Sequence, residues 1–141
     1  MGIFNKKTKA KKLTSLDELE PMLETGKPIL VDLMQQNCGP CRIMDGIVNE
    51  LAVEYGESVH IVKVDVTKVP GAAQTFGVRS TPTFVVLGRA NKKVSKKAQR
   101  KGKAQKAPSD RISPRWRHAG LVKKDQLSRV LESNGAKKVA V

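Results

Sequence analysis

The stretch at residues 31–56 reads VDLMQQNCGPCRIMDGIVNELAVEYG. It continues an apolar run at residues 28–34 that only Asp32 interrupts, which is typical of a strand buried on both faces. From residue 40 to residue 55 the apolar side chains recur at helical spacing, and a glycine follows where such a helix would end. The stretch therefore predicts a buried strand, a short loop and a helix that opens on Cys38-Gly39-Pro40-Cys41.

Cys38 and Cys41 are the two cysteines of the chain, which excludes a framework of structural disulfides. A lone pair of this kind is redox-active, metal-binding or incidental. Its position at the first turn of a helix favours a redox role, because unpaired amides and the helix dipole stabilise a thiolate there. Pro40 suits that turn, and the short spacing lets the two sulfurs join. Cys38 is therefore the expected nucleophile.

A zinc site requires four ligands, of which a single C-x-x-C supplies two. The imidazoles of the chain belong to His60 and His118, which we expect on the polar face of a strand and at a sheet edge. We therefore expect no bound metal and no other cofactor. The one tryptophan, Trp116, is expected to pack in the core or at the same edge.

Further elements are predicted on either side of the cysteine motif. Ser15 and Glu18 form a capping box ahead of a short helix that ends at Gly26. Apolar runs and alternations predict strands, and helical spacing predicts helices. The predicted strands are at residues 59–66, 83–87 and 115–118, and the predicted helices are at 70–76 and 123–131.

The positive charge of the chain is unevenly distributed. The 141 residues carry 27 lysines and arginines against 13 acids, a net charge of +14. Residues 1–12 hold five lysines and no acid, and residues 89–117 hold twelve basic residues and one acid. The remainder is close to neutral, so the excess charge is confined to two segments. A charge of this size usually reports contact with an anionic partner.

The segment at residues 90–111 lacks aromatic residues and is poor in β-branched ones, so we expect it to be mobile. Three alternatives stay open for the two basic segments: a nucleic acid or ribosome-like surface, an acidic protein or membrane surface, and no partner. Without aromatic side chains for stacking, base recognition is not expected. The candidate residues for contact with an anionic partner are Lys92, Lys93, Lys96, Lys97, Arg100, Lys101, Lys103 and Lys106.

No segment reads as a targeting signal or a membrane span. The N-terminal residues are charged and lack the apolar region of roughly 7 to 15 residues that a secretory signal requires. No apolar run approaches the roughly 18 residues of a membrane-spanning helix. We therefore expect a cytoplasmic protein without stable membrane insertion.

Three segments together resemble the thioredoxin family: the stretch at 31–56, VHIVKVDV at 59–66 and GVRSTPTFVVL at 77–87. In addition, RWRHAGLVKKDQLSRVLES at 115–133 resembles the last strand, glycine turn and closing helix of that family. The resemblance implies an α/β thioredoxin fold, in which a central mixed β-sheet is flanked by helices.

The same resemblance implies the organisation of the chain. A thioredoxin-like domain is expected at residues 13–134, between a basic arm at 1–12 and a frayed tail at 135–141. The basic insertion at about 90–111 would interrupt this domain before its last strand. By resemblance, that position lies at the end of the sheet opposite the cysteines.

Residues around the motif take their roles from the resemblance. Cys38 corresponds to the exposed attacking cysteine and Cys41 to the buried resolving cysteine. Pro82 corresponds to a proline that is cis in the family and packs beside them, and Thr81 presents its backbone to the substrate. The supporting positions of the active site are therefore Gly39, Pro40, Thr81 and Pro82.

Asp32 and Lys63 correspond to a buried carboxylate thought to assist proton transfer and to the lysine that accompanies it. Physical chemistry points the same way, because desolvation should raise the pKa of a carboxyl group in an apolar strand. A nearby ammonium group would moderate that rise. The alternative for Asp32 is an edge position that faces water.

The resemblance implies a thiol–disulfide oxidoreductase that reduces protein disulfides through the Cys38/Cys41 dithiol. Its partners would be disulfide-containing proteins and an external electron donor such as a thioredoxin reductase, and we expect a monomer. Met34 and Asn37 stand where the family places tryptophans, so the docking of partners is expected to differ. The competing hypothesis is a binding module for nucleic acid or another acidic partner, with a regulatory or vestigial redox centre.

Overall fold

A single mixed β-sheet forms the centre of the molecule. The computed structural model describes residues 10–88, 112 and 114–139. Within them, five strands lie in the order β1-β3-β2-β4-β5. Strands β1, β3 and β2 are parallel, and β4 and β5 are antiparallel to their neighbours. The strands are β1 (Lys11–Lys12), β2 (Ile29–Met34), β3 (His60–Asp65), β4 (Thr83–Leu87) and β5 (Pro114–Ala119).

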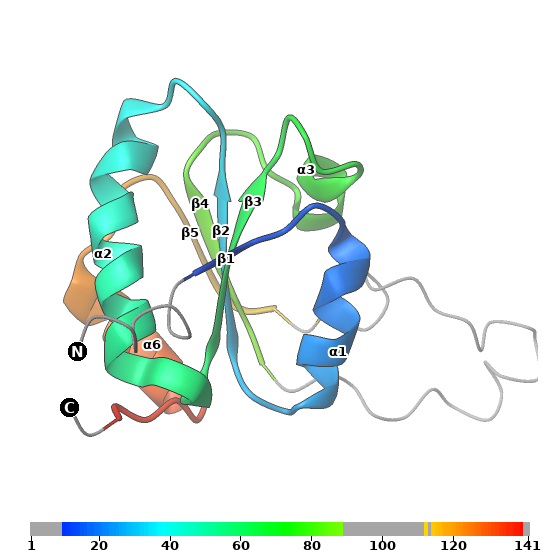
Figure 1. Ribbon diagram of the computed structural model, residues 1–141. Coiled ribbons are helices and arrows are strands. Elements are labelled where there is room, and N and C mark those ends of the chain that lie inside the picture. Colours follow the sequence, from blue (N-terminus) through cyan, green and yellow to red (C-terminus); the bar gives the residue numbers. More distant parts are fainter. Residues whose placement is uncertain (1–9, 89–111, 113, 140–141) are drawn as a thin grey trace, which may run out of the picture.

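Helices cover both faces of this sheet. Helices α2 and α6 lie on one side, and α1 and α3 lie on the other (Figure 1). Their bounds are α1 (Leu19–Glu24), α2 (Gly39–Tyr55), α3 (Ala72–Phe76) and α6 (Lys124–Ser133), and two 3-10 turns, η2 (Leu16–Glu18) and η3 (Gly56–Ser58), flank α1 and α2. None of the helices among the described residues has the length and apolar character needed to cross a membrane.

The alternation of side chains along β2 divides the core into two layers. Ile29, Val31 and Leu33 pack in the cluster that includes α1 and α3, whereas Leu30 packs in the cluster that includes α2 and α6. Because successive side chains of a strand point to opposite faces, Asp32 lies on the same face as Leu30. The carboxyl group therefore sits beneath α2, at a position that apolar residues occupy elsewhere in the sheet.

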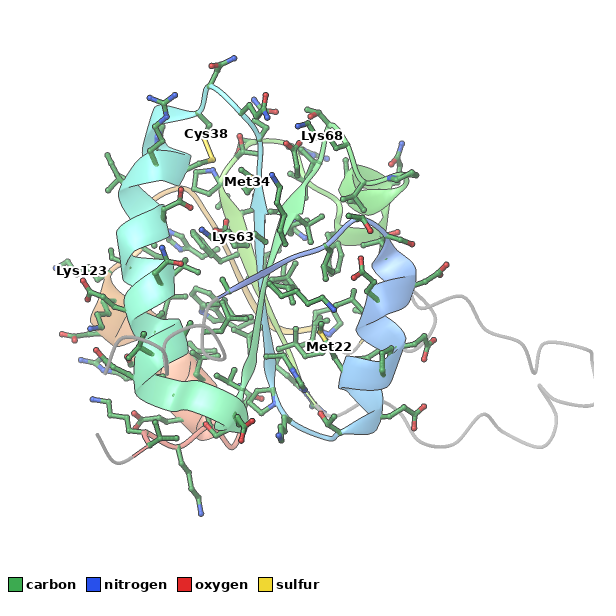
Figure 2. All side chains as sticks on the ribbon, in the orientation of Figure 1. Met22, Met34, Cys38, Lys63, Lys68 and Lys123 are labelled. Atoms are coloured by element: carbon green, nitrogen blue, oxygen red, sulfur yellow. A yellow bond between two sulfur atoms is a disulfide. The ribbon has the colours of Figure 1, made fainter. Side chains whose placement is uncertain are left out.

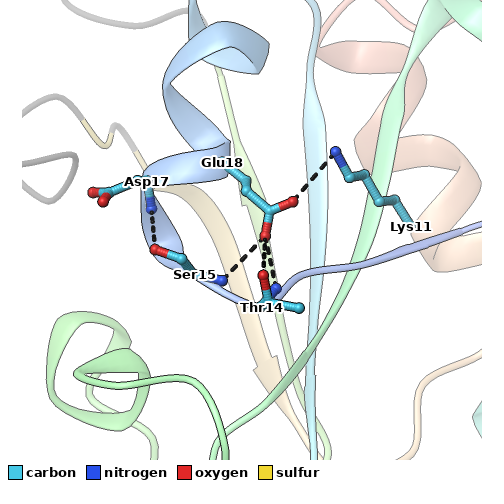
Figure 3. A network of polar contacts seen from close by, with 5 residues as sticks. All are labelled: Lys11, Thr14, Ser15, Asp17 and Glu18. Atoms are coloured by element: carbon cyan, nitrogen blue, oxygen red, sulfur yellow. Dashed lines mark hydrogen bonds and ion pairs between the residues drawn. The ribbon is translucent and has the colours of Figure 1, made fainter.

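The first helical segment begins with the predicted capping box. Ser15 accepts a hydrogen bond from the amide of Asp17, and Glu18 accepts from the amides of Thr14 at 2.7 Å and Ser15 at 3.1 Å (Figure 3). Lys11 adds an ion pair to the same carboxylate at 3.4 Å. These bonds satisfy amides that the start of a helix leaves unpaired.

The edge strand β1 was not expected from the sequence. Lys11 and Lys12, which we assigned to the basic arm, pair in parallel register with Val62 and Lys63. Both lysine side chains are exposed, so no apolar pattern indicates a strand there. Pairing uses main-chain groups and is compatible with exposed lysines at a sheet edge. The sheet therefore begins two residues before the predicted domain boundary.

The C-terminal segment is ordered further than we predicted. Up to Val139 the chain packs against the end of α2 instead of fraying. Ala136 is buried, and the amide of Val139 donates to the carbonyl of Glu54 at 2.8 Å. The amide of Lys137 donates to the Ser58 hydroxyl at 2.9 Å. The prediction of a frayed tail from residue 135 was wrong for residues 135–139, because tertiary contacts supply hydrogen bonds that the local sequence does not indicate.

The basic insertion joins the fold at the end of the sheet away from the cysteines. Leu87, at the end of β4, pairs with Ile29 at the start of β2 and with Pro114 of β5. Cys38 follows the opposite end of β2. The predicted location of the insertion is therefore confirmed for its attachment points. Residues 1–9 of the predicted basic arm lie outside the described residues, and so does the whole insertion at 90–111 with its candidate lysines and Arg100.

Candidate active site

The two cysteines lie at the start of α2. Cys38 is the N-cap residue and Cys41 lies in the first turn, and the two are joined by a disulfide bond. The Cys38 sulfur accepts a hydrogen bond from the amide of Cys41 at 3.2 Å. Gly39 and Pro40 occupy the first positions of the helix, where the missing amide of proline costs nothing. The cysteines are nearly buried, with 8% of Cys38 and 3% of Cys41 exposed.

The backbone before the cysteines turns at Asn37. Its φ of 59° lies in the left-handed region, which asparagine adopts more readily than most residues other than glycine. The turn brings the chain from the end of β2 into the N-cap of α2. This structural role of Asn37 is one that sequence reasoning missed, although an asparagine directly before a helix cap was a usable signal.

A loop from the other side of the sheet reaches the Cys38 sulfur. The peptide bond between Thr81 and Pro82 is cis, as the resemblance led us to expect. The Thr81 hydroxyl donates to the Cys38 sulfur at 3.6 Å, and the Thr81 carbonyl oxygen lies at the same distance from that sulfur. The Thr83 hydroxyl donates to the carbonyl of Ser80 at 2.7 Å, which ties the loop together. The structure thus places Thr81 against the predicted nucleophile.

Asp32 is a buried carboxyl group without a hydrogen-bond partner among the described residues. It is 1% exposed, and neither of its side-chain oxygens has a donor. Burial raises the pKa of Asp32 to about 7, while the positive charge of Lys63 opposes this rise and the negative charge of Asp45 adds to it. The alternative of an edge residue facing water is therefore wrong. The group can exchange a proton near neutral pH.

Asp65 shows that burial alone does not set the behaviour of a carboxyl group in this sheet. It is as buried as Asp32, and burial opposes its ionisation. The amide of Thr67 donates to its Oδ1 at 2.9 Å and the Thr67 hydroxyl donates to the same oxygen, and these bonds hold the pKa of Asp65 below its usual value. Burial raises the pKa of Asp32, and no hydrogen bond from the described residues opposes that rise.

Lys63 lies beside Asp32 in the sheet but pairs with another residue. The two are register neighbours of β3 and β2. Lys63 extends from the sheet toward α2 (Figure 2), and its Nζ lies 3.1 Å from Oδ1 of Asp45. Asp45 lies four residues after Cys41, on the same face of α2. Asp45 is a residue of this site that sequence reasoning missed, although its helical spacing from Cys41 could have indicated it.

The comparison with known families agrees with this geometry. The sequence model of the thioredoxin family matches residues 10–108, which is more than half of the chain. The chain belongs to the thioredoxin family. Solved thioredoxins share its fold: the Fasciola hepatica thioredoxin superimposes with a TM-score of 0.64 and 25% identity over 88% of this chain and 98% of that one. For the Schistosoma mansoni thioredoxin the TM-score is 0.65, with 21% identity over 90% and 96% of the two chains.

Curated thioredoxins match a shorter part of the sequence. Thioredoxin 1 of Synechococcus elongatus is 38% identical over 68 residues, which are 48% of this chain and 64% of that protein. The chloroplastic M-type thioredoxin of Chlamydomonas reinhardtii is 41% identical over 66 residues, 47% of each chain. The matched part of the chain thus spans about half to two thirds of these relatives. The predicted family and thioredoxin fold are both confirmed.

A recess beside the disulfide is lined by the two positions where the resemblance led us to expect tryptophans. Its volume is about 350 Å³. Met34 and Asn37 line it in place of those tryptophans, and Cys41 and Asp45 line it as well. Beside the cysteines, a thioether and an amide therefore stand where aromatic rings were expected.

The histidines have protein partners away from the cysteines. His60 Nε2 lies 2.9 Å from the Thr25 hydroxyl, and His118 Nε2 lies 2.8 Å from the carbonyl oxygen of Leu121. The half-buried Trp116 stacks on His118 and packs against the core beneath α2, as expected for an edge tryptophan. Over residues 10–88, 112 and 114–139, no group of three or more His, Cys, Asp or Glu side chains could hold a metal ion.

Proposed function

We propose that this chain is a thiol–disulfide oxidoreductase that reduces protein disulfides through reversible oxidation of Cys38 and Cys41. The observation that carries the proposal is the position of the cysteine pair. The two sulfurs are within bonding distance at the start of a 17-residue helix, and the Thr81 hydroxyl contacts the outer one. The helix dipole and the amide of Cys41 favour a thiolate at Cys38 once the disulfide is reduced.

In the first step, the Cys38 thiolate attacks one sulfur of a substrate disulfide. A bond forms between Cys38 and that sulfur, the substrate disulfide breaks, and the other substrate sulfur leaves as a thiolate. The product is a mixed disulfide between Cys38 and the substrate. The Thr81 backbone beside the Cys38 sulfur is the surface that would hold the substrate chain during this step.

In the second step, Cys41 resolves the mixed disulfide. Its thiol loses a proton to the Asp32 carboxylate, and the resulting thiolate attacks the Cys38 sulfur. The bond between Cys38 and the substrate breaks, and the second substrate sulfur leaves as a thiolate. The substrate has gained two electrons, and the protein holds the Cys38–Cys41 disulfide. A carboxyl group with a pKa of about 7 suits this proton transfer near neutral pH.

Each cycle ends with an oxidised protein, so an external donor must return two electrons. We assign this role to a thioredoxin reductase or an equivalent dithiol, and we place the monomeric protein in a reducing compartment such as the cytoplasm. One of the relatives reported above is named as chloroplastic, and a reducing organelle would serve the same chemistry.

The direct test is the rate at which the purified protein, supplied with a small dithiol, reduces a model protein disulfide. We expect a rate well above that of the dithiol alone, and we expect Cys38→Ser to abolish it. Cys41→Ser should instead accumulate a mixed disulfide with the substrate that mass spectrometry detects. Exchange that survives the removal of Cys38 would contradict the proposal.

A second candidate function is attachment to a nucleic acid or another acidic surface through the basic insertion. It is favoured by the charge distribution, because residues 89–117 carry twelve basic residues and one acid. The insertion joins the fold at the end of the sheet opposite Cys38. Attachment there would leave the cysteines accessible, so the two functions are compatible.

A further inference from the structure

The ion pair between Lys63 and Asp45 spans the space between β3 and α2. Its two atoms are 3.1 Å apart. Lys63 is also the register neighbour of Asp32, whose buried oxygens have no hydrogen-bond donor in the described part of the chain. The ammonium group therefore has two carboxylates within the reach of its flexible side chain, and it pairs with the one on the helix.

Solvent exposure explains this choice. The side chain of Asp45 is 43% exposed, at the wall of the recess, whereas Asp32 is 1% exposed. Pairing with Asp32 would require both charges to lose their water, which costs more than a partly hydrated pair does. Asp45 offers Lys63 a partner without that full desolvation. The pair with Asp45 thus holds the ammonium group near the recess.

We propose that Asp45 is a positioning residue for proton transfer at the cysteine pair: by holding the Lys63 ammonium group, it keeps the Asp32 carboxyl group without an ion-pair partner and free to exchange a proton with Cys41. The inference deepens the proposed function and rests on it. Asp45 does not contact the reacting sulfurs. It acts through Lys63, and its removal should release that side chain toward Asp32.

Among the described residues, the charged groups that act on Asp32 are Lys63 of β3 and Asp45 of α2. Cys41 lies in the first turn of the same helix. The third neighbouring element, β4, has the sequence TFVVL and places Phe84 beside Asp32, so it supplies no charge. The negative charge of Asp45 raises the pKa of Asp32 directly. Under the proposal, its ion pair with Lys63 raises that pKa further, by keeping the ammonium group away from Asp32. Both effects predict a lower pKa when Asp45 is neutralised.

A double-mutant cycle separates the indirect effect from the direct one. The Asp32 carboxyl carbon is titrated by NMR in the full-length reduced protein and in the Asp45→Asn, Lys63→Met and doubly substituted variants. We expect Asp45→Asn to lower the titration midpoint by roughly one pH unit when Lys63 is present, a tenfold loss of proton affinity. The same substitution in the Lys63→Met background should lower it by less than half as much. Equal shifts in the two backgrounds, or no shift at all, would overturn the proposal.

Glu50→Gln is the matched control. Glu50 is a carboxylate of the same helix that also pairs with a lysine, Lys124 at 2.8 Å. Glu50→Gln removes one negative charge from the helix, as Asp45→Asn does, but away from the cysteine site. The titration midpoint of Asp32 should therefore not change. A shift equal to that of Asp45→Asn would show a general effect of helix charge and would count against the proposal.

The kinetic readout is the rate at which Cys41 resolves a preformed mixed disulfide, measured against pH. The acidic limb of this profile should move to lower pH in Asp45→Asn by the same amount as the Asp32 midpoint. An acidic limb that stays in place while the midpoint moves would overturn the role in proton transfer. Because the NMR titration requires no turnover, it tests the arrangement of Asp45, Lys63 and Asp32 even if the Cys38→Ser assay contradicts the proposed function.

Discussion

Two buried carboxyl groups in the sheet, Asp32 and Asp65, differ in how readily they ionise. Asp65 accepts hydrogen bonds from Thr67 and ionises readily, whereas Asp32 has no donor among the described residues and retains its proton up to about pH 7. A protein gains no stability from an unpaired buried carboxylate, because the charged form has lost its water without compensation. A stabilising role in folding therefore does not account for this carboxyl group, and the proton transfer that we propose gives it a use.

The stability of the protein should depend on pH through Asp32. Its pKa rises from 3.8 in the unfolded chain to about 7 in the folded one, so between these values the folded state binds a proton that the unfolded state releases. Stability therefore falls as the pH rises through this window. Each pKa unit is worth about 1.4 kcal/mol, so ionised Asp32 costs the fold up to about 4 kcal/mol at pH 8.

Asp32→Asn should remove this cost. We expect the oxidised variant to be more stable than the oxidised wild type by about 2–4 kcal/mol near pH 8 and equally stable near pH 3, where Asp32 is mostly protonated in the folded and the unfolded state. Urea unfolding followed by circular dichroism at the two pH values measures the difference. The same gain at both pH values would mean that packing, and not ionisation, separates the two proteins.

At the scale of elements, the start of α2 contains a residue, Cys38, that is both the helix cap and the expected nucleophile. A helix usually begins with a side-chain oxygen that accepts from its first amides, and here the Cys38 sulfur takes that place. The left-handed residue Asn37 directs the chain into this cap. The same unpaired amides that a cap must satisfy are those that would stabilise a thiolate, so one geometry serves both purposes.

The capping box of η2 provides a second prediction at this scale. Hydrogen bonds from the Thr14 and Ser15 amides lower the pKa of Glu18 from 4.5 to about 2. The stabilisation is therefore present above pH 4.5 and is lost as the pH falls toward 2. Glu18→Gln should lower the thermal midpoint by a few degrees at pH 7, and the two proteins should converge near pH 2.

Asp17→Asn is the control for the capping box. It removes an acidic charge from the same first turn, but its carboxylate does not accept from the Thr14 or Ser15 amide. We expect a smaller loss of thermal stability at pH 7 from this substitution. Equal losses from the two variants would assign the effect to the helix dipole and would argue against the capping geometry.

At the scale of the whole molecule, the two unusual features of the chain lie apart. The cysteine pair follows the end of β2, whereas the basic insertion connects β4 to β5 at the sheet end where β2 begins. Residues 91–110 contain eight basic residues and one acid, so their removal lowers the net charge from +14 to +7. The remaining residues between Leu87 and Pro114 are enough to connect two antiparallel strands.

Deletion of residues 91–110 should leave the rate of disulfide reduction unchanged, because the junction is distant from Cys38. It should lower the salt concentration at which the protein elutes from immobilised DNA, since fewer phosphates are neutralised. A full-length variant with the eight basic residues replaced by glutamine separates charge from length and should elute with the deletion. Elution of both variants with the wild type would argue against attachment through the insertion.

Much of the fold follows from local patterns. The apolar runs predicted β2, β3 and β4, and the helical spacing predicted α2 and α6. A buried face of a strand or helix requires apolar residues at the repeat of that element, and this repeat is visible in the sequence. The cysteine motif and its helix-capping position were also readable, since proline and the cysteine spacing act within a single turn. These features depend on residues that are neighbours in the sequence.

The tertiary structure decided the contacts between distant segments. Main-chain hydrogen bonds pair Lys11–Lys12 with β3 and join Val139 to Glu54. Such bonds depend little on the identity of the side chains, so the sequence does not indicate them. Asp45 was recognisable as a polar residue on a helix, but its partner depended on the distance between α2 and β3. Lys63 has two carboxylates within reach, and only the packed structure determines which of them remains hydrated enough to hold it.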